Sequence, residues 1–268
     1  MSCCSGPHIS LGKTLYETVL SMQESKANAI QVFLGSPTQY KIRSFDEKDL
    51  QRTGDYLRFA NKKLYVHAPY IINLASPDEE MVARAKQSLQ TILDTLAKVD
   101  SERTGTVLHI GAKGTLQNVI QRINDLHISS PLFLENCAES CKFGKNMNEL
   151  WKLREGIHSS NVGFCLDTCH CHSSKLCDMS NSESVVRMFE DLQSKQVIVH
   201  LNDSKTDYGS GLDRHAIVGF GKIWNYYQGE SFESLITLRD YCKDHSFDII
   251  LETPSENIQS YELNILQR

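Results

Sequence analysis

The sequence lacks any long apolar run, and it lacks the features that divide a chain into domains. None of its 268 residues falls in a stretch of about 18 apolar residues, so we expect no membrane-spanning helix. The first ten residues, MSCCSGPHIS, have neither the charged start nor the apolar middle of a signal peptide. No Pro/Gly/Ser-rich linker, internal repeat or low-complexity tract interrupts the chain. Because 40% hydrophobic residues suffice for one large core, residues 1–268 are expected to form a single domain.

Positive charge is also in short supply. The chain has 28 Lys and Arg against 33 Asp and Glu, which gives a formal net charge of −5. This balance argues against a basic nucleic-acid binder, because such proteins neutralise phosphates with Lys and Arg side chains. It does not exclude a protein whose bound metal ions supply the positive charge.

Paired C-x-x-C motifs are absent, although the chain has nine cysteines. Four of them, Cys165, Cys169, Cys171 and Cys177, surround Asp167, but their spacing is not that of a structural zinc site. With no secretion signal, an odd number of cysteines indicates free thiols in a reducing compartment, either cytoplasm or nucleus. A viral or an organellar setting also remains open, although the sequence carries no recognisable address signal.

Motifs for organic cofactors are missing as well. There is no dinucleotide fingerprint, and the glycine-rich stretch GSGLDRHAIVGFG departs from the P-loop pattern. No Ser–His–Asp or Cys–His arrangement stands out either. We therefore expect neither an organic cofactor nor a side-chain nucleophile, and we interpret the glycines as letting the backbone approach a polar cluster closely.

What the chain does have is a regular alternation of short apolar runs and longer amphipathic segments. Nearly continuous runs such as AIQVF, TVLHI and VIVHL are typical of strands covered on both faces. The strands are expected at 4–9, 29–33, 63–67, 105–110, 131–135, 162–167, 196–201 and 247–252. The helices are expected at 14–25, 46–61, 78–98, 115–126, 147–157, 182–194, 231–245 and 255–267. Eight strand–helix units in this order predict a (β/α)8 TIM barrel.

Polar side chains of the metal-binding type recur where these strands end. The residues at strand ends are His8, His67, His109, Glu135, Asp167, His200 and Glu252. Any one of them alone would more often be an ordinary hydrogen-bonded or surface residue, but seven placed alike are hard to ascribe to chance. Since the carboxyl ends of barrel strands meet at one face, we expect a metal cluster at that face.

Three further candidate ligands lie in turns. Asp167 and His170 have i, i+3 spacing, and Asp213 and His215 have i, i+2 spacing, so each pair can converge on one ion. Imidazole and carboxylate groups without convincing cysteine ligands suit zinc or manganese. Without His8 these residues make nine ligands, which could hold two or three ions if carboxylates bridge between them. Closely spaced ions suit in-line displacement at phosphorus.

At this point a family resemblance is plain. The motifs are GPHIS, HAPYIINLASP, LHIGA, LEN, CLDTCH, HLNDSK, GSGLDRHAIVGFG and ILET, which run in order from about residue 6 to residue 254. They resemble those of the endonuclease IV family of apurinic/apyrimidinic endonucleases. The resemblance implies three zinc ions in a TIM barrel. The implied ligands are His67, His109 and Glu135 for the first ion; Glu135, Asp167, His200 and Glu252 for the second; and His170, Asp213 and His215 for the third.

The resemblance also implies an activity. It is hydrolysis of the phosphodiester 5′ to an abasic site in double-stranded DNA, which leaves a 3′-hydroxyl, with removal of 3′-blocking groups as a companion activity. Glu135, Asp167 and Glu252 would be the catalytic carboxylates, whereas His8 would lie behind the metal ligands.

Family enzymes insert side chains from two loops into the gap left by a flipped-out abasic nucleotide. Tyr70 and Ile71 resemble the residues of one such loop. Thr38 and Gln39 fall in the other insertion loop, and Arg214 adjoins two ligands. Thr38 departs from the family pattern, because bacterial members tend to carry an arginine there.

Two other functions remain open. Sugar isomerases share the barrel and a metal–carboxylate site, but they typically use fewer histidine ligands. A catalytically inert damaged-DNA-binding protein would show broken ligand positions, and none is broken here. For the enzyme we expect a monomer that needs no membrane and no organic cofactor.

Overall fold

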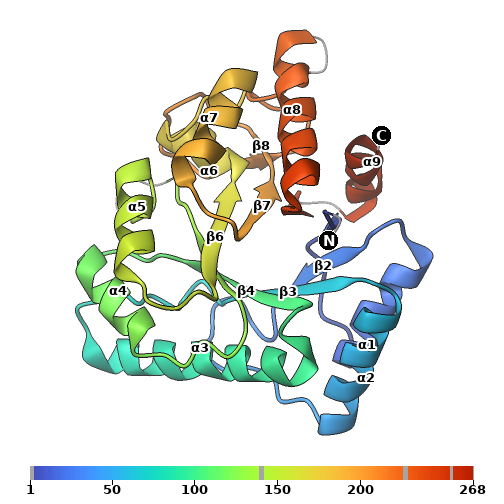
Figure 1. Cartoon of the computed structure of the whole chain (residues 1–268), viewed down its shortest axis with the longest axis vertical. Helices are drawn as coiled ribbons and strands as arrows, with labels where there is room; N and C mark the ends of the chain where they lie inside the picture. Colours follow the sequence, from blue (N-terminus) through green and yellow to red (C-terminus); the bar gives the residue numbers. More distant parts are fainter. Residues whose placement is uncertain (1–2, 139–141, 226–228, 254–255, 268) are drawn as a thin grey trace.

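Eight parallel strands form a single sheet with the spatial order β1-β10-β7-β6-β5-β4-β3-β2 (Figure 1). The computed structural model describes the chain except for residues 1–2, 139–141, 226–228, 254–255 and 268. The strands are β1 (Ser5–Pro7), β2 (Ala29–Val32), β3 (Lys63–His67), β4 (Thr104–His109), β5 (Leu132–Glu135), β6 (Val162–Asp167), β7 (Val197–Leu201) and β10 (Asp248–Leu251). Each predicted strand is present, and no strand end differs from its prediction by more than two residues.

The first and last strands of this order, β1 and β2, meet and close the sheet into a barrel. His8 and Gln31 form a parallel bridge, in which the N–H of Ile9 donates to the carbonyl of Gln31 at 2.9 Å. Nearby, the N–H of Asn28 donates to the carbonyl of Ser5 at 3.0 Å. The predicted (β/α)8 barrel is therefore confirmed.

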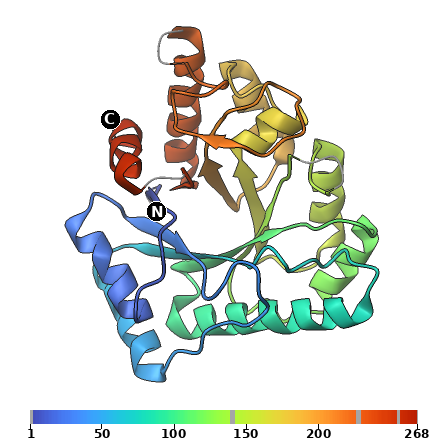
Figure 2. The same cartoon turned by 180° about the vertical axis from the view of Figure 1, so that it is seen from behind.

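The helices lie outside the barrel, as Figures 1 and 2 show from opposite sides. The helices are α1 (Leu15–Leu20) with the 3-10 turn η1 (Ser21–Glu24), α2 (Glu47–Phe59), α3 (Glu79–Asp100), α4 (Leu116–Asn124), α5 (Met147–Gly156), α6 (Thr168–Ser174), α7 (Ser182–Leu192), α8 (Gly229–His245) and α9 (Glu256–Leu266). The longest, α3, begins where the sequence indicates, because the Asp78 side chain accepts hydrogen bonds from the N–H groups of Glu80 and Met81. Its buried positions follow the 3.6-residue period, for example Val82, Ala85 and Leu89.

Two layers of apolar side chains fill the molecule. The larger cluster packs the helices against the outside of the strands. The smaller one fills the inside of the barrel and consists of Cys4, Ala29, Tyr65, Val107, Phe133, Cys165, Ile198 and Ile250. A Cβ on Gly105 would lie only 2.7 Å from the ring of Phe133, so this inner layer is tightly packed. The barrel interior therefore has an apolar middle layer. The candidate ligands gather at its carboxyl end, and at its amino end the buried carboxylate of Asp248 accepts hydrogen bonds from Lys63 and Tyr65.

Two elements were not predicted. Helix α6 directly follows β6, and the short antiparallel pair β8 (Asp203–Ser204) and β9 (His215–Ala216) follows β7. Both occupy the carboxyl face of the barrel, and together they carry His170 and His215. They escaped prediction because they are short and polar, with no apolar periodicity to reveal them.

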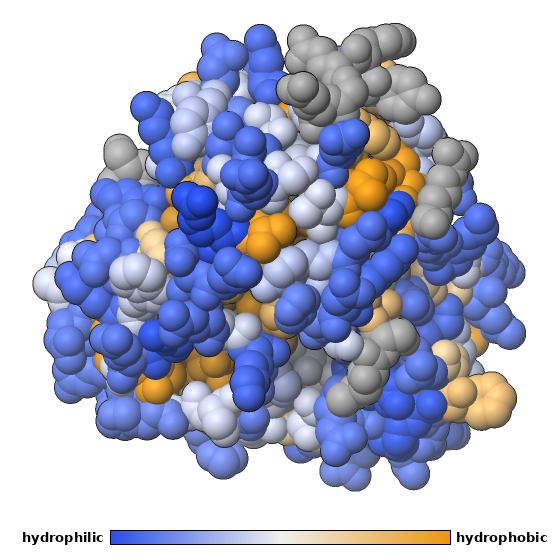
Figure 3. Space-filling model, turned by 45° about the horizontal axis from the view of Figure 1, so that its top comes forward, coloured by the Kyte–Doolittle hydropathy of each residue, from blue (hydrophilic) through white to orange (hydrophobic). Residues whose placement is uncertain are grey.

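The surface is mostly polar. The face shown in Figure 3 is mainly hydrophilic and carries separate hydrophobic patches rather than one continuous apolar area. Among the helices that the structure describes, none combines the length and the apolar character that crossing a bilayer requires.

Candidate metal centre

Strand register brings the predicted ligands to one level. His109 on β4 is the register partner of Glu135 on β5, and Asp167 on β6 is the partner of His200 on β7. A cavity of about 340 Å³ opens above them. Seven of the nine predicted ligands line it, namely His67, His109, Glu135, His170, Asp213, His215 and Glu252. The other two, Asp167 and His200, are fully buried within the same cluster.

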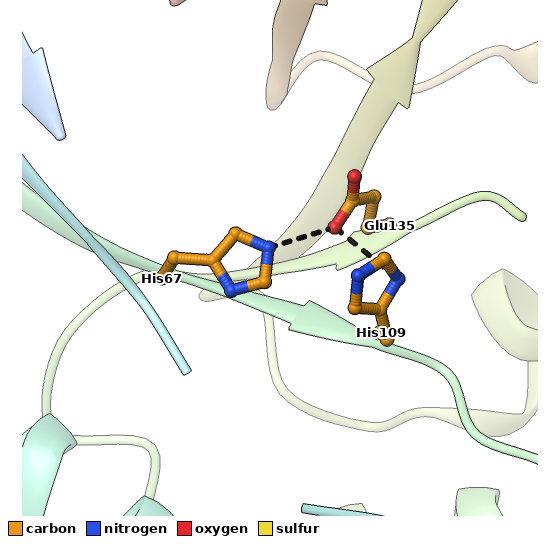
Figure 4. Close-up of side chains that lie close together, drawn as sticks. All are labelled: His67, His109 and Glu135. Carbon is orange, nitrogen blue, oxygen red and sulfur yellow. Dashed lines mark hydrogen bonds and ion pairs between the residues drawn. The ribbon is translucent and has the colours of Figure 1, made fainter. Parts of the chain in front are cut away.

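The first group consists of His67, His109 and Glu135. Both imidazole rings point toward the Glu135 carboxylate, as Figure 4 shows. Nε2 of His67 lies 3.2 Å from Oε2 of Glu135, and Nδ1 of His109 lies 3.4 Å from the same oxygen. One oxygen of Glu135 thus faces this group, and the other is left for its neighbours.

The second group consists of Glu135, Asp167, His200 and Glu252. Nδ1 of His200 lies 3.1 Å from Oε1 of Glu135 and 3.2 Å from Oε2 of Glu252. Glu135 therefore directs one oxygen at each of the first two groups, which is the arrangement of a bridging carboxylate.

The third group consists of His170, Asp213 and His215. The two oxygens of Asp213 lie 3.1 Å from Nε2 of His170 and 3.0 Å from Nε2 of His215. Nε2 of His215 is also 3.6 Å from Oδ2 of Asp167. Asp167 therefore lies between the second and third groups.

Hydrogen bonds on the side away from the carboxylates set the orientations of three histidine rings. Nδ1 of His67 bonds the carbonyl of Ala68 at 2.7 Å, and Nδ1 of His170 bonds the carbonyl of Asn136 at 2.9 Å. Nε2 of His200 bonds the side-chain oxygen of Gln31 at 2.9 Å. Each of these bonds leaves the other ring nitrogen directed at the carboxylates, as in metal sites whose outer partners orient the ligands.

Three buried nitrogens provide a test of whether metal ions fit these groups. Nδ1 of His109, Nε2 of His170 and Nε2 of His215 make no hydrogen bond, although each lies within 3.0–3.4 Å of a carboxylate oxygen. Ligand atoms around a tetrahedral zinc ion are roughly 3.3 Å apart, given zinc–ligand distances of about 2.0–2.2 Å. The spacing and the unpaired nitrogens therefore fit ligands directed at a common ion.

Three of the four acidic ligands, Glu135, Asp213 and Glu252, favour their charged form, whereas burial raises the pKa of Asp167. Burial alone would raise the pKa of Glu135, but the imidazoles of His109 and His200 outweigh burial and hold that pKa well below its ordinary value. Burial opposes the same shift in Glu252, where His200 again outweighs it and lowers the pKa well below the ordinary value. Burial lowers the pKa of His109 to about 4, which keeps that ring neutral. Charged carboxylate and neutral imidazole are the forms that bind metal ions.

The concentrated negative charge also acts on the deeper histidines. Burial would lower the pKa of His170, but Asp167, Asp213 and Glu135 outweigh burial and raise it well above the ordinary value. The cluster therefore attracts cations, and metal binding would displace protons from it.

Two thiols lie close to the ligands. The sulfur of Cys165 lies within 4.8 Å of ligand atoms of Glu135 and His200, and that of Cys169 lies equally near Asp167 and His215. Burial raises the pKa of Cys165 to about 12 and that of Cys169 to about 11. Since only a thiolate binds metal ions well, the imidazole and carboxylate groups remain the better ligands. Both Cys165 and Cys169 are free thiols, and Cys141 lies outside the described residues.

The predicted DNA-contacting residues lie around the mouth of the cavity. Tyr70 lines the cavity and is 57% exposed, and its ring centroid is 5.2 Å from that of His67. Its N–H donates to the carbonyl of Pro37 at 2.7 Å, which ties the Tyr70–Ile71 loop to the loop that carries Thr38 and Gln39. The side chains of Thr38 and Gln39 are exposed.

Arg214 is also exposed, and it lies between the ligands Asp213 and His215. Its carbonyl accepts a hydrogen bond from the N–H of Lys205 at 2.8 Å, which holds the β8–β9 segment. His8, predicted to lie behind the ligands, places Nδ1 3.1 Å from Oε1 of Glu252.

Sequence reasoning missed several polar residues that support the ligands. Nδ2 of Asn202 donates to Oδ2 of Asp167 at 2.6 Å, and the side-chain oxygen of Asn136 accepts from the Asp167 N–H at 2.7 Å. Their position close after a ligand, in LEN and HLND, was an available signal. Gln31 stands in an apolar strand, and Lys142 lines the cavity without belonging to any motif.

Asp203 is a further such residue, because it holds the loop that follows β9, the strand that carries His215. Its buried carboxylate accepts hydrogen bonds from the N–H groups of Gly219 at 3.0 Å, Gly221 at 3.1 Å and Ile223 at 2.9 Å. A Cβ on Gly221 would come within 2.2 Å of Oδ1 of Asp203, so only glycine allows this close approach.

Comparisons with known proteins agree with this geometry. Residues 21–267 match the family model described as "Xylose isomerase-like TIM barrel". The chain is 30% identical over 272 residues to a protein named "Probable endonuclease 4" from Aquifex aeolicus (strain VF5), covering 94% of this chain and 92% of that protein. It is similar to the crystal structure of endonuclease IV from Thermus thermophilus, with a TM-score of 0.82 and 26% identity over 98% of this chain and 97% of that one. A D-tagatose 3-epimerase-like protein shares the fold, with a TM-score of 0.70 and 19% identity over 98% and 96% of the two chains.

Proposed function

Because this chain belongs to the endonuclease IV family, we propose that it is a zinc-dependent DNA-repair endonuclease. Its substrate is double-stranded DNA that contains an abasic site. It hydrolyses the phosphodiester 5′ to that site and leaves a 3′-hydroxyl, and it also removes blocking groups from 3′ ends. It acts as a monomer, within one domain and without an organic cofactor, in a reducing compartment of the cell.

One observation supports the proposal above all others. Five imidazoles and four carboxylates from separate parts of the chain converge in three groups around one cavity, with ligand atoms within 4.8 Å of one another in each group. Adjacent groups share Glu135 or Asp167. Such a donor set suits three neighbouring zinc ions.

In the proposed centre, the metal ions and the protein side chains have different roles. Zinc, when bound, supplies Lewis acidity toward phosphate oxygens and a source of nucleophile at neutral pH. The chain would hold the first ion with His67, His109 and Glu135, the second with Glu135, Asp167, His200 and Glu252, and the third with His170, Asp213 and His215. Asn202 and Asn136 hold Asp167 in place through the bonds described above. Asp167 is thereby kept oriented, while the neighbouring imidazoles lower the pKa values of Glu135 and Glu252 and keep those two carboxylates charged.

Recognition of the abasic site falls to the loops at the cavity mouth. A missing base weakens stacking, so the duplex can be opened there at low cost and the gap filled by a side chain. Tyr70, which is exposed and lies against the ring of His67, is positioned for that task together with its chain neighbour Ile71. Thr38 and Gln39 would contact the strand from the adjoining loop, and Arg214 would contact a phosphate.

The fold alone would also suit a sugar isomerase or epimerase. That likeness, however, is at 19% identity and concerns the barrel only. A damaged-DNA-binding protein without catalysis is the other alternative, and it would leave an abasic duplex intact.

A single cleavage assay separates these functions. The protein is incubated with an end-labelled duplex containing one tetrahydrofuran abasic analogue, without magnesium, beside a matched duplex containing thymine at that position. We expect incision of the abasic strand only, a product that DNA polymerase can extend from its 3′-hydroxyl, and loss of incision with 1,10-phenanthroline that zinc restores. Absence of incision by zinc-loaded protein, or equal cleavage of both duplexes, would contradict the proposal. Epimerisation of a ketohexose would instead support the sugar enzyme.

A further inference from the structure

We propose that Gln31 is a positioning residue that orients His200 and Glu252 toward the same metal ion. This inference rests on the proposed function, in which those two residues belong to the second metal group. It concerns a residue outside every motif of the ligand set, contributed by a strand that carries no ligand.

The strand β2 fixes Gln31 inside the barrel. All four residues of β2 are buried, and Gln31 is 0% exposed. Its neighbour two positions earlier, Ala29, belongs to the apolar cluster inside the barrel, so the side chain of Gln31 also points inward. The bridge to His8 at the seam of the barrel anchors its backbone. An amide group is thus buried directly behind the ligands.

The contacts of this amide determine which way it faces. Nε2 of Gln31 lies 2.7 Å from Oε1 of Glu252 and 3.0 Å from Nδ1 of His8. A carboxylate can only accept hydrogen bonds, so the amino group of Gln31 must face Glu252. Its oxygen then faces Nε2 of His200 at 2.9 Å, which requires that nitrogen to carry a hydrogen.

The consequence is a defined orientation for His200. With its hydrogen on Nε2, the ring presents the lone pair of Nδ1 to Oε1 of Glu135 at 3.1 Å and to Oε2 of Glu252 at 3.2 Å. His67 and His170 are oriented in the same manner by backbone carbonyls. Of these three histidines, His200 alone depends on a side chain for its orientation, so a mutation can remove that support.

Gln31 also determines which oxygen of Glu252 faces the metal group. The hydrogen bond to Oε1 leaves Oε2 directed at His200 and the metal group. Without the amide, the carboxylate can rotate and His200 can exchange its ring hydrogen between the two nitrogens. Loss of an outer partner of this kind typically weakens metal affinity by about 10–100-fold.

The test compares Gln31→Met with a matched control, Gln259→Met. Methionine keeps the length of the side chain and removes the amide. Gln259 is also buried, but its amide donates to the backbone carbonyls of His8 and Thr253 rather than to a ligand side chain. Zinc is withdrawn from each holoenzyme by a graded chelator, and ¹¹³Cd-substituted samples are examined by NMR.

In Gln31→Met we expect one ion to leave about tenfold to a hundredfold more readily, with the other ions held as in the wild type. One ¹¹³Cd resonance should shift or broaden while the others stay. Retention of every ion with wild-type affinity would overturn the proposal. If all ions were bound equally more weakly in both variants, Gln31 would have only a structural role, and this result would also overturn the proposal.

A second measurement needs no variant. Long-range ¹H–¹⁵N correlation spectra of the zinc-loaded wild type should show the His200 ring protonated at Nε2, and protonation at Nδ1 would overturn the proposal. Failure of the wild type to cut abasic DNA would count against the proposed function. The comparison of Gln31→Met with the wild type would still decide whether Gln31 supports the ion held by His200 and Glu252.

Discussion

Replacing Glu252 with glutamine keeps the shape of the side chain and removes its charge, and the surrounding contacts show why the amide cannot substitute. Oε1 of Glu252 accepts a hydrogen bond from Nε2 of Gln31 at 2.7 Å, while Oε2 lies 3.2 Å from Nδ1 of His200. The introduced side chain would have only one oxygen. If that oxygen faces Gln31, an NH2 group occupies the metal side, and the reverse orientation sets two NH2 groups against each other.

Either orientation removes or weakens one ligand of the second group. Loss of a single preorganised partner of the transition state typically costs about 10²–10³ in turnover, or about 2.7–4 kcal/mol. We therefore expect Glu252→Gln to fold, to lose zinc more readily and to cut abasic DNA at least about a hundredfold more slowly.

The assay is single-turnover cleavage of the abasic duplex with enzyme in excess, with zinc content and melting temperature recorded on the same samples. Glu262→Gln is the matched control, because Glu262 is a buried carboxylate whose partners are not ligands. It accepts from the N–H of Val218 at 3.0 Å and from the hydroxyl of Thr253. The control is expected to lose stability but to keep its turnover. Near-normal turnover and full zinc content in Glu252→Gln would refute the reasoning and make Glu252 a structural carboxylate.

The charge and the exposed side chains of the site give three further predictions. Zinc removal should weaken binding of abasic duplex at least about tenfold at low salt, because three Zn²⁺ add six positive charges to a chain of net charge −5; equally tight binding by apoprotein with an unchanged circular dichroism spectrum would contradict this. Tyr70→Ala with Ile71→Ala should reduce the preference for abasic over intact duplex and leave zinc content unchanged, as binding titrations would show. Lys142, the only Lys or Arg among the described residues that line the cavity, should contact a phosphate. Lys142→Ala would then reduce the magnitude of the slope of log K for DNA binding against log salt concentration by about 1. Lys86 pairs with Asp125 away from the cavity, so Lys86→Ala should leave this slope unchanged.

Sequence patterns revealed the barrel because its strands are buried on both faces. Runs such as VIVHL and AIQVF do not alternate apolar with polar residues, so the positions and ends of these strands could be predicted to within two residues. The ligands at strand ends were readable for the same reason, since each stands at the boundary of an apolar run. Helix α6 and the β8–β9 pair had no such boundary, and the grouping of His170, Asp213 and His215 came from the family resemblance rather than from periodicity.

The supporting residues were harder to predict, because their roles depend on contacts between distant segments. Gln31 meets Glu252 across 221 positions of the chain, and Asp203 binds the N–H groups of a loop some 16 to 20 residues later. A single polar residue in the apolar strand AIQV was a signal, but its partners could be identified only once the barrel had closed. Local patterns therefore predict the ligands, and tertiary contacts reveal what orients them.

The central claim is that nine residues on the carboxyl face of the barrel hold three zinc ions that cleave abasic DNA. Anomalous diffraction at the zinc edge, on crystals of protein shown to be active, tests it most directly. The account predicts three peaks: one among His67, His109 and Glu135; one among Glu135, Asp167, His200 and Glu252; and one among His170, Asp213 and His215. A fully active protein with one peak or none at these positions would contradict it.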